Sequence, residues 1–216
     1  MSQTLRSIMA NSPYLVIVAL LAIVPAVVTN LYHIQVMIFI GIYIILTLSL
    51  NLLNGYVGLL SIGHAAFYGI GAYASAKLVM EAGLPFTLAM PCAGAVAGIF
   101  GYLIAKPTLR LSGIYMTLAT LGFNMICFLI LQNWMSFTNG PLGIMDIPPP
   151  NIFGYEIETR VQYYYLIFFL VLLTVVSMHR LMTCRFGRAL VSIRENELAA
   201  EAMGVNTTRY KKQAFV

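Results

Sequence analysis

The feature that most constrains the fold is a series of long, continuously apolar runs. Each run approaches the ~20 residues that an α-helix needs to cross about 30 Å of hydrocarbon. Lipid offers the backbone no hydrogen-bonding partners, so only helices and closed barrels span it. Barrel strands would alternate apolar and polar residues, and these runs do not. The pattern predicts an all-α, polytopic helical membrane protein, and a hydrophobic content of 60% agrees.

Six spans can be drawn, followed by the start of a seventh apolar segment. The six cover Tyr14–Leu31, Val36–Leu53, Gly63–Met80, Phe86–Ala105, Ile114–Leu131 and Gln162–Leu181. The last residues, Gln213–Val216, look like the beginning of another apolar segment behind a basic flank. We therefore expect one transmembrane domain over residues 1–216, truncated at its C-terminus.

Lysine and arginine predict the orientation of the spans. With six spans, Arg6, the pair Lys106 and Arg110, and the cations of the last loop all fall on one side. Such cations gather on the cytoplasmic side, so we expect the N-terminus and loop 182–212 in the cytoplasm and loop 132–161 outside. The net charge of +5 therefore lies beside spans and does not indicate nucleic-acid binding.

Charge is concentrated near the C-terminal end, where 10 of the 19 charged side chains lie between Arg180 and Lys212. Within this stretch Asn196 is a good N-cap, and Glu197 follows in the first turn, where the helix dipole favours an acid. Gly204 supplies a left-handed terminator. These signals predict a short helix that is marginal alone in water and therefore needs a surface, either a partner protein or lipid headgroups.

A second informative region lies between the second and third runs. The glycines of Gly55–Ser75 favour a broken or re-entrant segment near a cavity. Polar residues inside spans are costly and tend to face a partner or a water-filled path. The candidates for such a path are Asn51, Asn54, Ser61, His64, Thr117, Thr120 and Asn124. The alternative is that each caps a helix or bonds a neighbouring carbonyl, and for His64 this is the simpler interpretation.

No motif indicates chemistry within this chain. The sequence GIGAYA, with Gly69, Gly71 and Ala74, formally matches a dinucleotide-binding fingerprint, but it lies inside an apolar span with no strand before it. There is no Walker A motif, no HExxH, no Cys/His cluster at metal spacing and no nucleophile elbow. We expect no enzymatic activity, no cofactor and no metal ion.

Four segments together resemble the permease subunits of bacterial ABC importers for branched-chain amino acids. They are Ser49–Tyr73, Arg110–Phe123, TNGPLGI at Thr138–Ile144, and FGRALVSIRENELAAEAMGVNTTRY at Phe186–Tyr210. The coupling segment of ABC permeases reads EAA, three residues, then Gly, and Ala199, Ala200 and Gly204 match it. Leu198 replaces the Glu, with Glu197 one position earlier, as in the branched-chain group. Within that group the chain is most similar to the M-type subunit.

The resemblance implies a machine with several partners in the bacterial inner membrane. These are a homologous second permease subunit, cytoplasmic ATP-binding subunits that hydrolyse ATP, a periplasmic solute-binding protein docked on the external loop, and the surrounding lipid. It also implies that a short cytoplasmic helix couples the permease to the ATPase. The coupling residues would be Arg194, Glu195, Asn196, Glu197, Ala199, Ala200 and Gly204.

Three alternatives stay open at this point. Close relatives of the branched-chain group carry urea or short amides. An ATP-independent channel or carrier would have no soluble ATPase partner. A membrane scaffold would use its basic loop to bind anionic lipid, although Glu195, Glu197 and Glu201 would then face that lipid.

Overall fold

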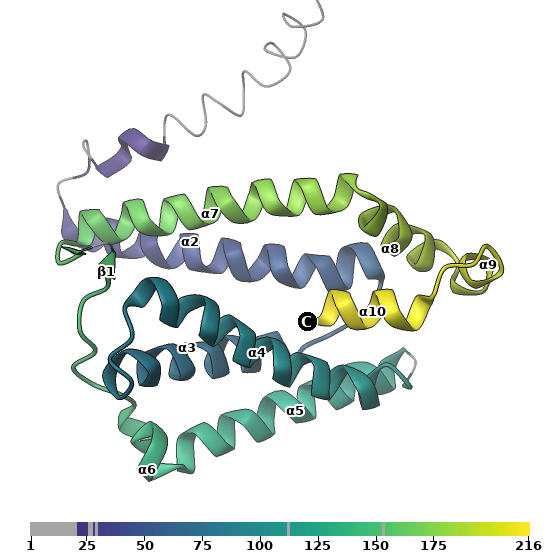
Figure 1. Cartoon of the computed structure of the whole chain (residues 1–216), viewed down its shortest axis with the longest axis horizontal. Helices are drawn as coiled ribbons and strands as arrows, with labels where there is room; N and C mark the ends of the chain where they lie inside the picture. The colour runs from purple at the N-terminus through teal and green to yellow at the C-terminus, as the bar shows by residue number, and fades with distance from the viewer. Residues whose placement is uncertain (1–20, 26–27, 29, 112, 153) are drawn as a thin grey trace, which may run out of the picture. The chain divides into compact units, whose positions relative to one another are not determined.

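The computed structural model describes residues 21–25, 28, 30–111, 113–152 and 154–216. Most of the predicted span Tyr14–Leu31 lies outside them. The described chain is almost entirely helical (Figure 1), which confirms the all-α prediction. Its helices are α2 (Leu31–Asn51), the π-helix η1 (Leu52–Val57), α3 (His64–Met80), α4 (Phe86–Thr108), α5 (Ile114–Asn133), α6 (Met135–Thr138), the 3₁₀ turn η2 (Gly140–Leu142), α7 (Arg160–Thr183), α8 (Arg185–Glu195), α9 (Glu197–Ala202) and α10 (Thr207–Phe215). The strands β1 (Asn151–Ile152) and β2 (Tyr155–Glu156) form one antiparallel ladder.

The chain divides into two compact units. The first ends at Ile45 and resumes over Glu158–Thr174, and the second comprises Leu46–Ile157 and Val175–Val216. Helices α2 and α7 each continue from one unit into the other. The candidate functional residues described below all belong to the second unit.

In the first unit, the N-terminal part of α2 packs against the first turns of α7. Ile34 and Ile38 of α2 and Tyr164 of α7 form its buried cluster. The hydroxyl of Tyr164 donates to the carbonyl of Leu21 at 2.7 Å, so this buried polar group is satisfied.

Helix α2 begins earlier than the sequence predicts. The apolar pattern predicts a start at Val36, but the helix begins at Leu31, so that boundary is wrong. The cause is Asn30, whose side-chain oxygen accepts from the amide of Tyr32 at 2.9 Å and whose carbonyl accepts from the amide of His33 at 3.1 Å. Hydropathy does not register such a local cap, because capping depends on one polar side chain before the apolar run.

Among the residues that the structure describes, four helical stretches are long and apolar enough to cross a membrane: Leu31–Val57, Phe86–Thr108, Ile114–Asn133 and Arg160–Thr183. Helix α3 has 17 residues, or about 26 Å at 1.5 Å per residue, slightly less than the hydrocarbon thickness. Helices α3, α4, α5 and α7 match predicted spans to within a few residues at each end.

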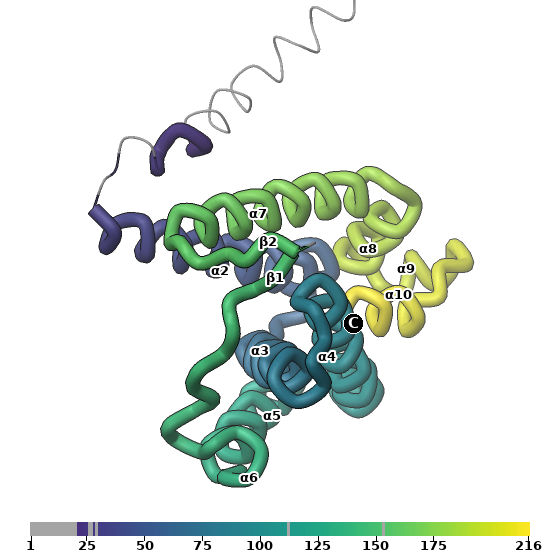
Figure 2. The backbone as a smooth tube through the Cα atoms, turned by 60° about the vertical axis from the view of Figure 1, so that its left-hand side comes forward, coloured from purple at the N-terminus to yellow at the C-terminus, as the bar shows by residue number. Residues whose placement is uncertain are grey.

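In the second unit, α3, α4 and α5 lie side by side (Figure 2). Alanines fill the interior of the α3–α4 pair: Ala66 and Ala76 on α3 and Ala89 and Ala93 on α4 are buried. Small side chains let helix backbones approach closely where lipid supplies no hydrophobic driving force.

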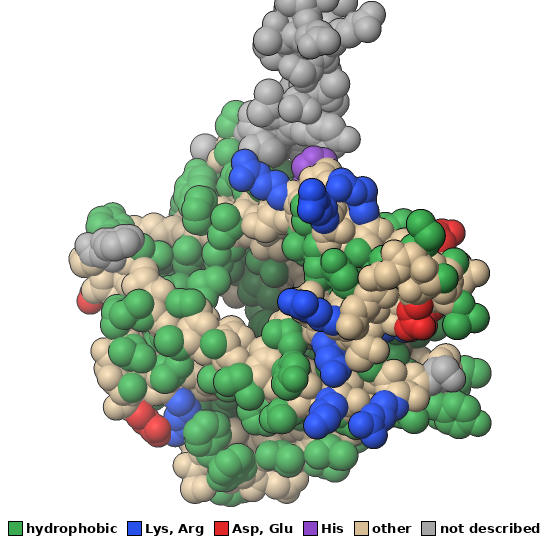
Figure 3. Space-filling view, turned by 45° about the vertical axis from the view of Figure 1, so that its right-hand side comes forward, with side chains coloured by type: hydrophobic (Ala, Val, Ile, Leu, Met, Phe, Trp, Pro, Cys, Tyr) green, Lys and Arg blue, Asp and Glu red, His purple; other side chains and the backbone are tan. Residues whose placement is uncertain are grey.

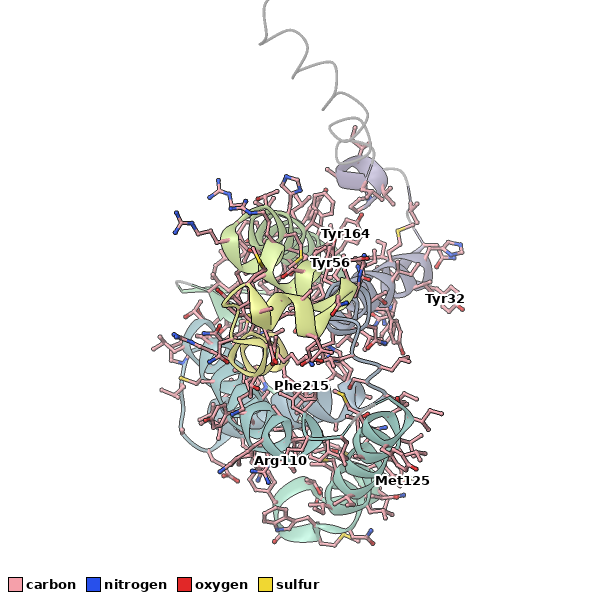
Figure 4. All side chains as sticks on the ribbon, turned by 90° about the vertical axis from the view of Figure 1, so that its right-hand side faces the viewer. Tyr32, Tyr56, Arg110, Met125, Tyr164 and Phe215 are labelled. Atoms are coloured by element: carbon pink, nitrogen blue, oxygen red, sulfur yellow. The ribbon has the colours of Figure 1, made fainter. Side chains whose placement is uncertain are left out.

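Helices α8 and α10 close one end of this unit through a shared apolar core. Phe215 of α10 meets Phe67 of α3 edge-on, with ring centroids 6.0 Å apart, and its ring lies between α10 and the other helices (Figure 4). Leu190 of α8 is completely buried in the same core. The core comprises Leu53, Val57, Ala105, Met116, Leu190, Ala214 and Phe215.

The predicted loop 132–161 begins with α6 and η2 and then runs without helix or strand from Gly143 to Pro150 before reaching β1 (Figure 2). This agrees with the extended conformation that three successive prolines favour. Thr138 is fully buried and donates to the carbonyls of Leu131 and Trp134, which anchors the start of the loop to the end of α5.

The predicted loop 182–212 contains more structure than its sequence signals suggest, since α8 and α10 flank the predicted short helix. Helix α8 buries Gly187, Leu190 and Ile193 on one face, whereas Arg185 and Arg188 are exposed. This is an amphipathic pattern of helical period. Its high content of arginine hides it from a search for long apolar runs.

Candidate functional site

The short helix α9 has the local caps that the sequence predicts. Asn196 accepts a hydrogen bond from the amide of Ala199 at 3.0 Å, and Glu197 lies in the first turn. At the other end Gly204 is left-handed, with φ of 84°. The amide of Gly204 bonds the carbonyl of Glu201 at 2.9 Å, and Val205 bonds Ala200 at 3.0 Å, which is a complete Schellman motif. The prediction of a helix between Asn196 and Gly204 is confirmed.

The acidic residues around α9 pair with basic or hydroxyl groups of their own chain. The carboxylate of Glu195 accepts from Arg194 at 2.5 Å, and Glu197 pairs with Lys211 at 2.5 Å. Glu201 accepts from the hydroxyl of Thr207 at 2.6 Å, which ties α9 to α10. Glu197 and Glu201 therefore tie α9 to α10, whereas Glu195 pairs with its neighbour in the sequence.

The outward face of α9 is apolar. Leu198 is 79% exposed and Met203, just after the helix, is 85% exposed. Ala199 is also exposed, whereas Ala200 is only 4% exposed and seats the helix against its own chain. Leu198 and Met203 are not among the coupling residues that the sequence predicts. The replacement of the usual Glu by Leu198 is the sequence signal that indicates an apolar contact here.

Basic side chains surround this region of the second unit. Figure 3 shows lysine and arginine side chains gathered on the face that carries α8 and α10, with acidic groups at its border. A groove of about 440 Å³ on this unit joins the segment after η1, the α4–α5 connection and the start of α9. Its charged lining residues are Arg110, Arg194, Glu195, Glu197 and Lys211. The segment after η1, the α4–α5 connection and the segment between α8 and α9, which the lysine and arginine pattern predicts to be cytoplasmic, therefore meet at one groove.

The helix is broken between η1 and α3, as the glycines predict. Residues 58–63 are neither helical nor extended into a strand, and Gly58 is left-handed with φ of 77°. Polar side chains from elsewhere hold this segment. Asn54 accepts from the amide of Ser61 at 3.0 Å, Thr120 accepts from the amide of Ile62 at 3.1 Å, and Thr117 donates to the carbonyl of Leu60 at 3.1 Å.

His64, the first residue of α3, lines a cavity of about 240 Å³ beside this break. The side chain is half-buried, and its Nδ1 atom is buried without a hydrogen-bond partner. Its ring meets Phe67 edge-on at 6.4 Å. The lining presents polar and apolar surface in similar amounts and consists of Ser49, Leu52, Leu53, His64, Phe67, Gly94, Ala97, Gly98, Ala214, Phe215 and Val216.

The predicted path residues therefore separate into three groups. Asn54, Ser61, Thr117 and Thr120 come together at the break, where their hydrogen bonds serve the backbone, and only the buried Oγ of Ser61 lacks a partner. His64 lines the cavity. The remaining two are elsewhere: Asn51 is exposed at the end of α2, and Asn124 is half-buried on α5 and does not line the His64 cavity. Within the described residues, no group of three or more His, Cys, Asp or Glu could hold a metal ion.

Comparisons with known proteins agree with this arrangement. A family model described as "Branched-chain amino acid transport system / permease component" matches residues 32–216. The high-affinity branched-chain amino acid transport system permease proteins LivM of Salmonella typhimurium (strain LT2) and Escherichia coli (strain K12) are 39% and 38% identical to this chain over 197 residues. Each match covers 81% of this chain and 46% of the relative, so the chain spans about half the length of these relatives. No solved structure matches the chain significantly.

The family match covers α2 through α10, and thus includes the broken segment, the His64 cavity and α9. Together with helices of membrane-spanning length, it identifies a multi-pass membrane protein. The chain belongs to the family of permease components of branched-chain amino acid transport systems.

Proposed function

We propose that this chain is part of the permease subunit of an ATP-driven importer for branched-chain amino acids in the bacterial inner membrane. The observation that carries the proposal is α9, a capped helix whose acids are paired internally and whose outward face is apolar. The N-terminus and the α8–α10 segment would lie in the cytoplasm. The chain would transport and not catalyse, and ATP hydrolysis would belong to a separate subunit.

The outward face of α9 suits a groove on that ATP-binding subunit. Burying Leu198 and Met203 would contribute roughly 1.5–3 kcal/mol for each side chain. In this chain Leu198 is 79% exposed and Met203 is 85% exposed, so this burial free energy is gained only when α9 docks. The internal pairs of Glu197 with Lys211 and of Glu201 with Thr207 keep α9 preorganised, which lowers the entropic cost of docking.

The translocation path would pass the break between η1 and α3. The His64 cavity presents both apolar side chains and polar atoms, which suits an amino acid with a branched aliphatic side chain. On the outer side, the loop 132–161 would dock a periplasmic solute-binding protein. Leu142, Met145 and Ile147 are exposed there. A homologous second permease subunit and membrane lipid would cover further apolar surface.

The alternatives are now unequal. The family match weighs against a urea or short-amide permease, because it names a branched-chain amino acid transport system. The acids of α9 oppose a lipid-binding scaffold only in part, since Glu197 is paired with Lys211 whereas Glu201 keeps its charge, so the family match is what weighs most against it. A channel or carrier has no ATP-binding subunit, so no partner protein would cover the apolar face of α9.

The decisive experiment expresses the full-length protein with its ATP-binding subunits and measures their co-purification and leucine uptake. Leu198→Arg should remove co-purification and reduce uptake by at least about tenfold, as loss of an interface hot spot does. Thr208→Arg, an exposed position at the start of α10, is the matched control and should change neither. Uptake that survives ATP depletion would support the channel or carrier instead.

The path is tested separately through His64. His64→Ala should change the ratio of leucine uptake to alanine uptake, because it removes the polar group and enlarges the cavity. An unchanged ratio would mean that His64 only packs against Phe67.

A further inference from the structure

Arg194 is bound to the broken helix of its own chain. Its Nη1 atom donates to the carbonyl of Gly55 in η1 at 2.9 Å, across 139 residues of sequence. Its Nε and Nη2 atoms donate to the carboxylate of Glu195 at 3.2 and 2.5 Å. Both ends of the guanidinium fork are therefore engaged within the chain, with a geometry that a lysine ammonium does not reproduce.

The Gly55 carbonyl is available because the helix stops there. In a continued α-helix it would accept from the amide of Leu59. That amide instead donates to the carbonyl of Leu53 at 3.0 Å, since the chain turns at Gly58. Arg194 replaces the missing donor. Gly58 makes room for it: a Cβ atom at this position would lie 2.9 Å from Cγ of Arg194.

Helix α8 joins Arg194 firmly to α9. Asn196 is at once the C-cap of α8 and the N-cap of α9, so a single residue separates the two helices. On its other face α8 buries Leu190 and Ile193, and Leu190 packs in the core that contains Leu53 and Val57 of η1. A displacement of α9 therefore reaches η1 through α8.

The far end of the break is held by a different helix. Thr117 and Thr120 of α5 bond Leu60 and Ile62, respectively. Residues 58–63 thus lie between an attachment to α8 at Gly55 and an attachment to α5, and His64 of the cavity follows directly. A movement of α8 relative to α5 would therefore act on these residues from both ends.

On the basis of the proposed function, we propose that Arg194 is a positioning residue that transmits the movement of α9 to the break at residues 58–63. It does this through the Gly55 carbonyl and not through a contact with the ATP-binding subunit. A contact made in one conformation and lost in the other biases the equilibrium by its differential free energy. Removing it should therefore uncouple ATP hydrolysis from transport without detaching the ATPase.

The test uses the full-length complex reconstituted in liposomes, with ATP hydrolysis and leucine uptake measured in parallel. Arg194→Ala should keep ATP-binding subunits bound and hydrolysis within about twofold, while uptake per ATP falls about tenfold, the factor that one charge-assisted hydrogen bond corresponds to. Arg194→Lys should be uncoupled in the same direction. Arg188→Ala is the matched control, because Arg188 lies on α8 but bonds only the nearby carbonyl of Thr183.

Hydrogen exchange distinguishes the transmission of movement by Arg194 from a purely structural role of this residue. In the wild type, nucleotide binding should change exchange both in α9 and at residues 58–62. In Arg194→Ala the change in α9 should persist, and the change at 58–62 should disappear.

Full coupling in Arg194→Lys would overturn the proposal. Loss of the ATP-binding subunits in Arg194→Ala would also overturn it, because Arg194 would then be a contact with the ATPase. A wild-type complex without ATP hydrolysis would instead contradict the proposed function, so the two failures are distinguishable.

Discussion

Helix α9 and the break at residues 58–63 are both short irregular regions of one unit, and they satisfy their backbone groups in opposite ways. The helix α9 is capped by its immediate neighbours, Asn196 and Gly204. The break has one local partner, Asn54, but it also depends on Thr117 and Thr120, and the turn before it on Arg194, all far away in sequence. A region with local caps can form before its partner arrives, whereas a region held by distant side chains moves when those side chains move.

The two regions also differ in what they present. Helix α9 turns Leu198 and Met203 outward, whereas the break buries Ser61 and leads directly into His64, which lines the cavity. The proposed function assigns the contact with another subunit to α9 and the response to that contact to the break. Four substitutions or measurements can break or sharpen this contrast.

The largest effect should come from Ala200→Arg. Ala200 is buried, so an arginine there must either displace α9 or bury an unpaired charge, at a cost of about 3 kcal/mol or more. Leucine uptake should fall to background, and hydrogen exchange over residues 197–203 should approach that of an unfolded segment. Ala199→Arg, on the exposed side of the same helix, should leave this exchange unchanged. Equal effects of both variants would mean that α9 is not seated as described.

Thr120→Val should have the next largest effect and should act on the break. Thr120 is 1% exposed, and valine keeps its shape while removing the acceptor for the amide of Ile62. An unsatisfied buried amide costs about 1–3 kcal/mol. The melting temperature of the purified protein should fall, while exchange in α9 stays the same. Thr117→Val is the control, because that side chain is only half-buried and should cost less.

A smaller effect is expected at the end of α9. Gly204→Ala places a Cβ atom in open space but forces a left-handed alanine, which costs roughly 1–2 kcal/mol. Hydrogen exchange in α9 should rise by about tenfold. Gly204→Asn should rise less, since asparagine tolerates this conformation. If both variants match the wild type, the Schellman motif does not limit the opening of α9.

The smallest effect concerns the pKa of the Cys184 thiol at the start of α8, and its measurement leaves this residue unchanged. The backbone N–H of Gly187 hydrogen-bonds the Cys184 sulfur and lowers the pKa of this exposed thiol, and Arg188 acts in the same direction. A lower pKa gives more thiolate at a given pH, so alkylation should reach half its maximal rate at a lower pH than in an unfolded peptide of the same sequence. Measurement of maleimide labelling against pH in a Cys92→Ala background checks this, and identical curves would contradict it.

Local signals in the sequence were enough to predict α9 and most span boundaries. Asn196 and Gly204 act on amides and carbonyls a few residues away, so their effect can be inferred from spacing alone. The same logic failed at α2, where Asn30 starts the helix before the apolar run. Helices α8 and α10 were missed because arginine and lysine on their exposed faces interrupt the apolar residues along the sequence.

The candidate site was predicted less completely than the fold. The residues of α9 were found, but the orientation of their charges was not: Glu197 and Glu201 bind Lys211 and Thr207 of the same chain. Asn54, Thr117 and Thr120 were selected as polar residues in spans, yet they hold the backbone of the break. Polarity in a span indicates that a partner exists, but sequence does not say whether that partner is a solute or the protein itself.

The sequence by itself determined the helical membrane fold, the break after Gly55 and the capped helix α9, because hydropathy, glycine and caps act within one element. Only the tertiary structure decided that Arg194 bonds the Gly55 carbonyl and that His64 faces a cavity. These contacts join residues on different helices, and their existence depends on how the helices pack. No spacing along the chain encodes that packing.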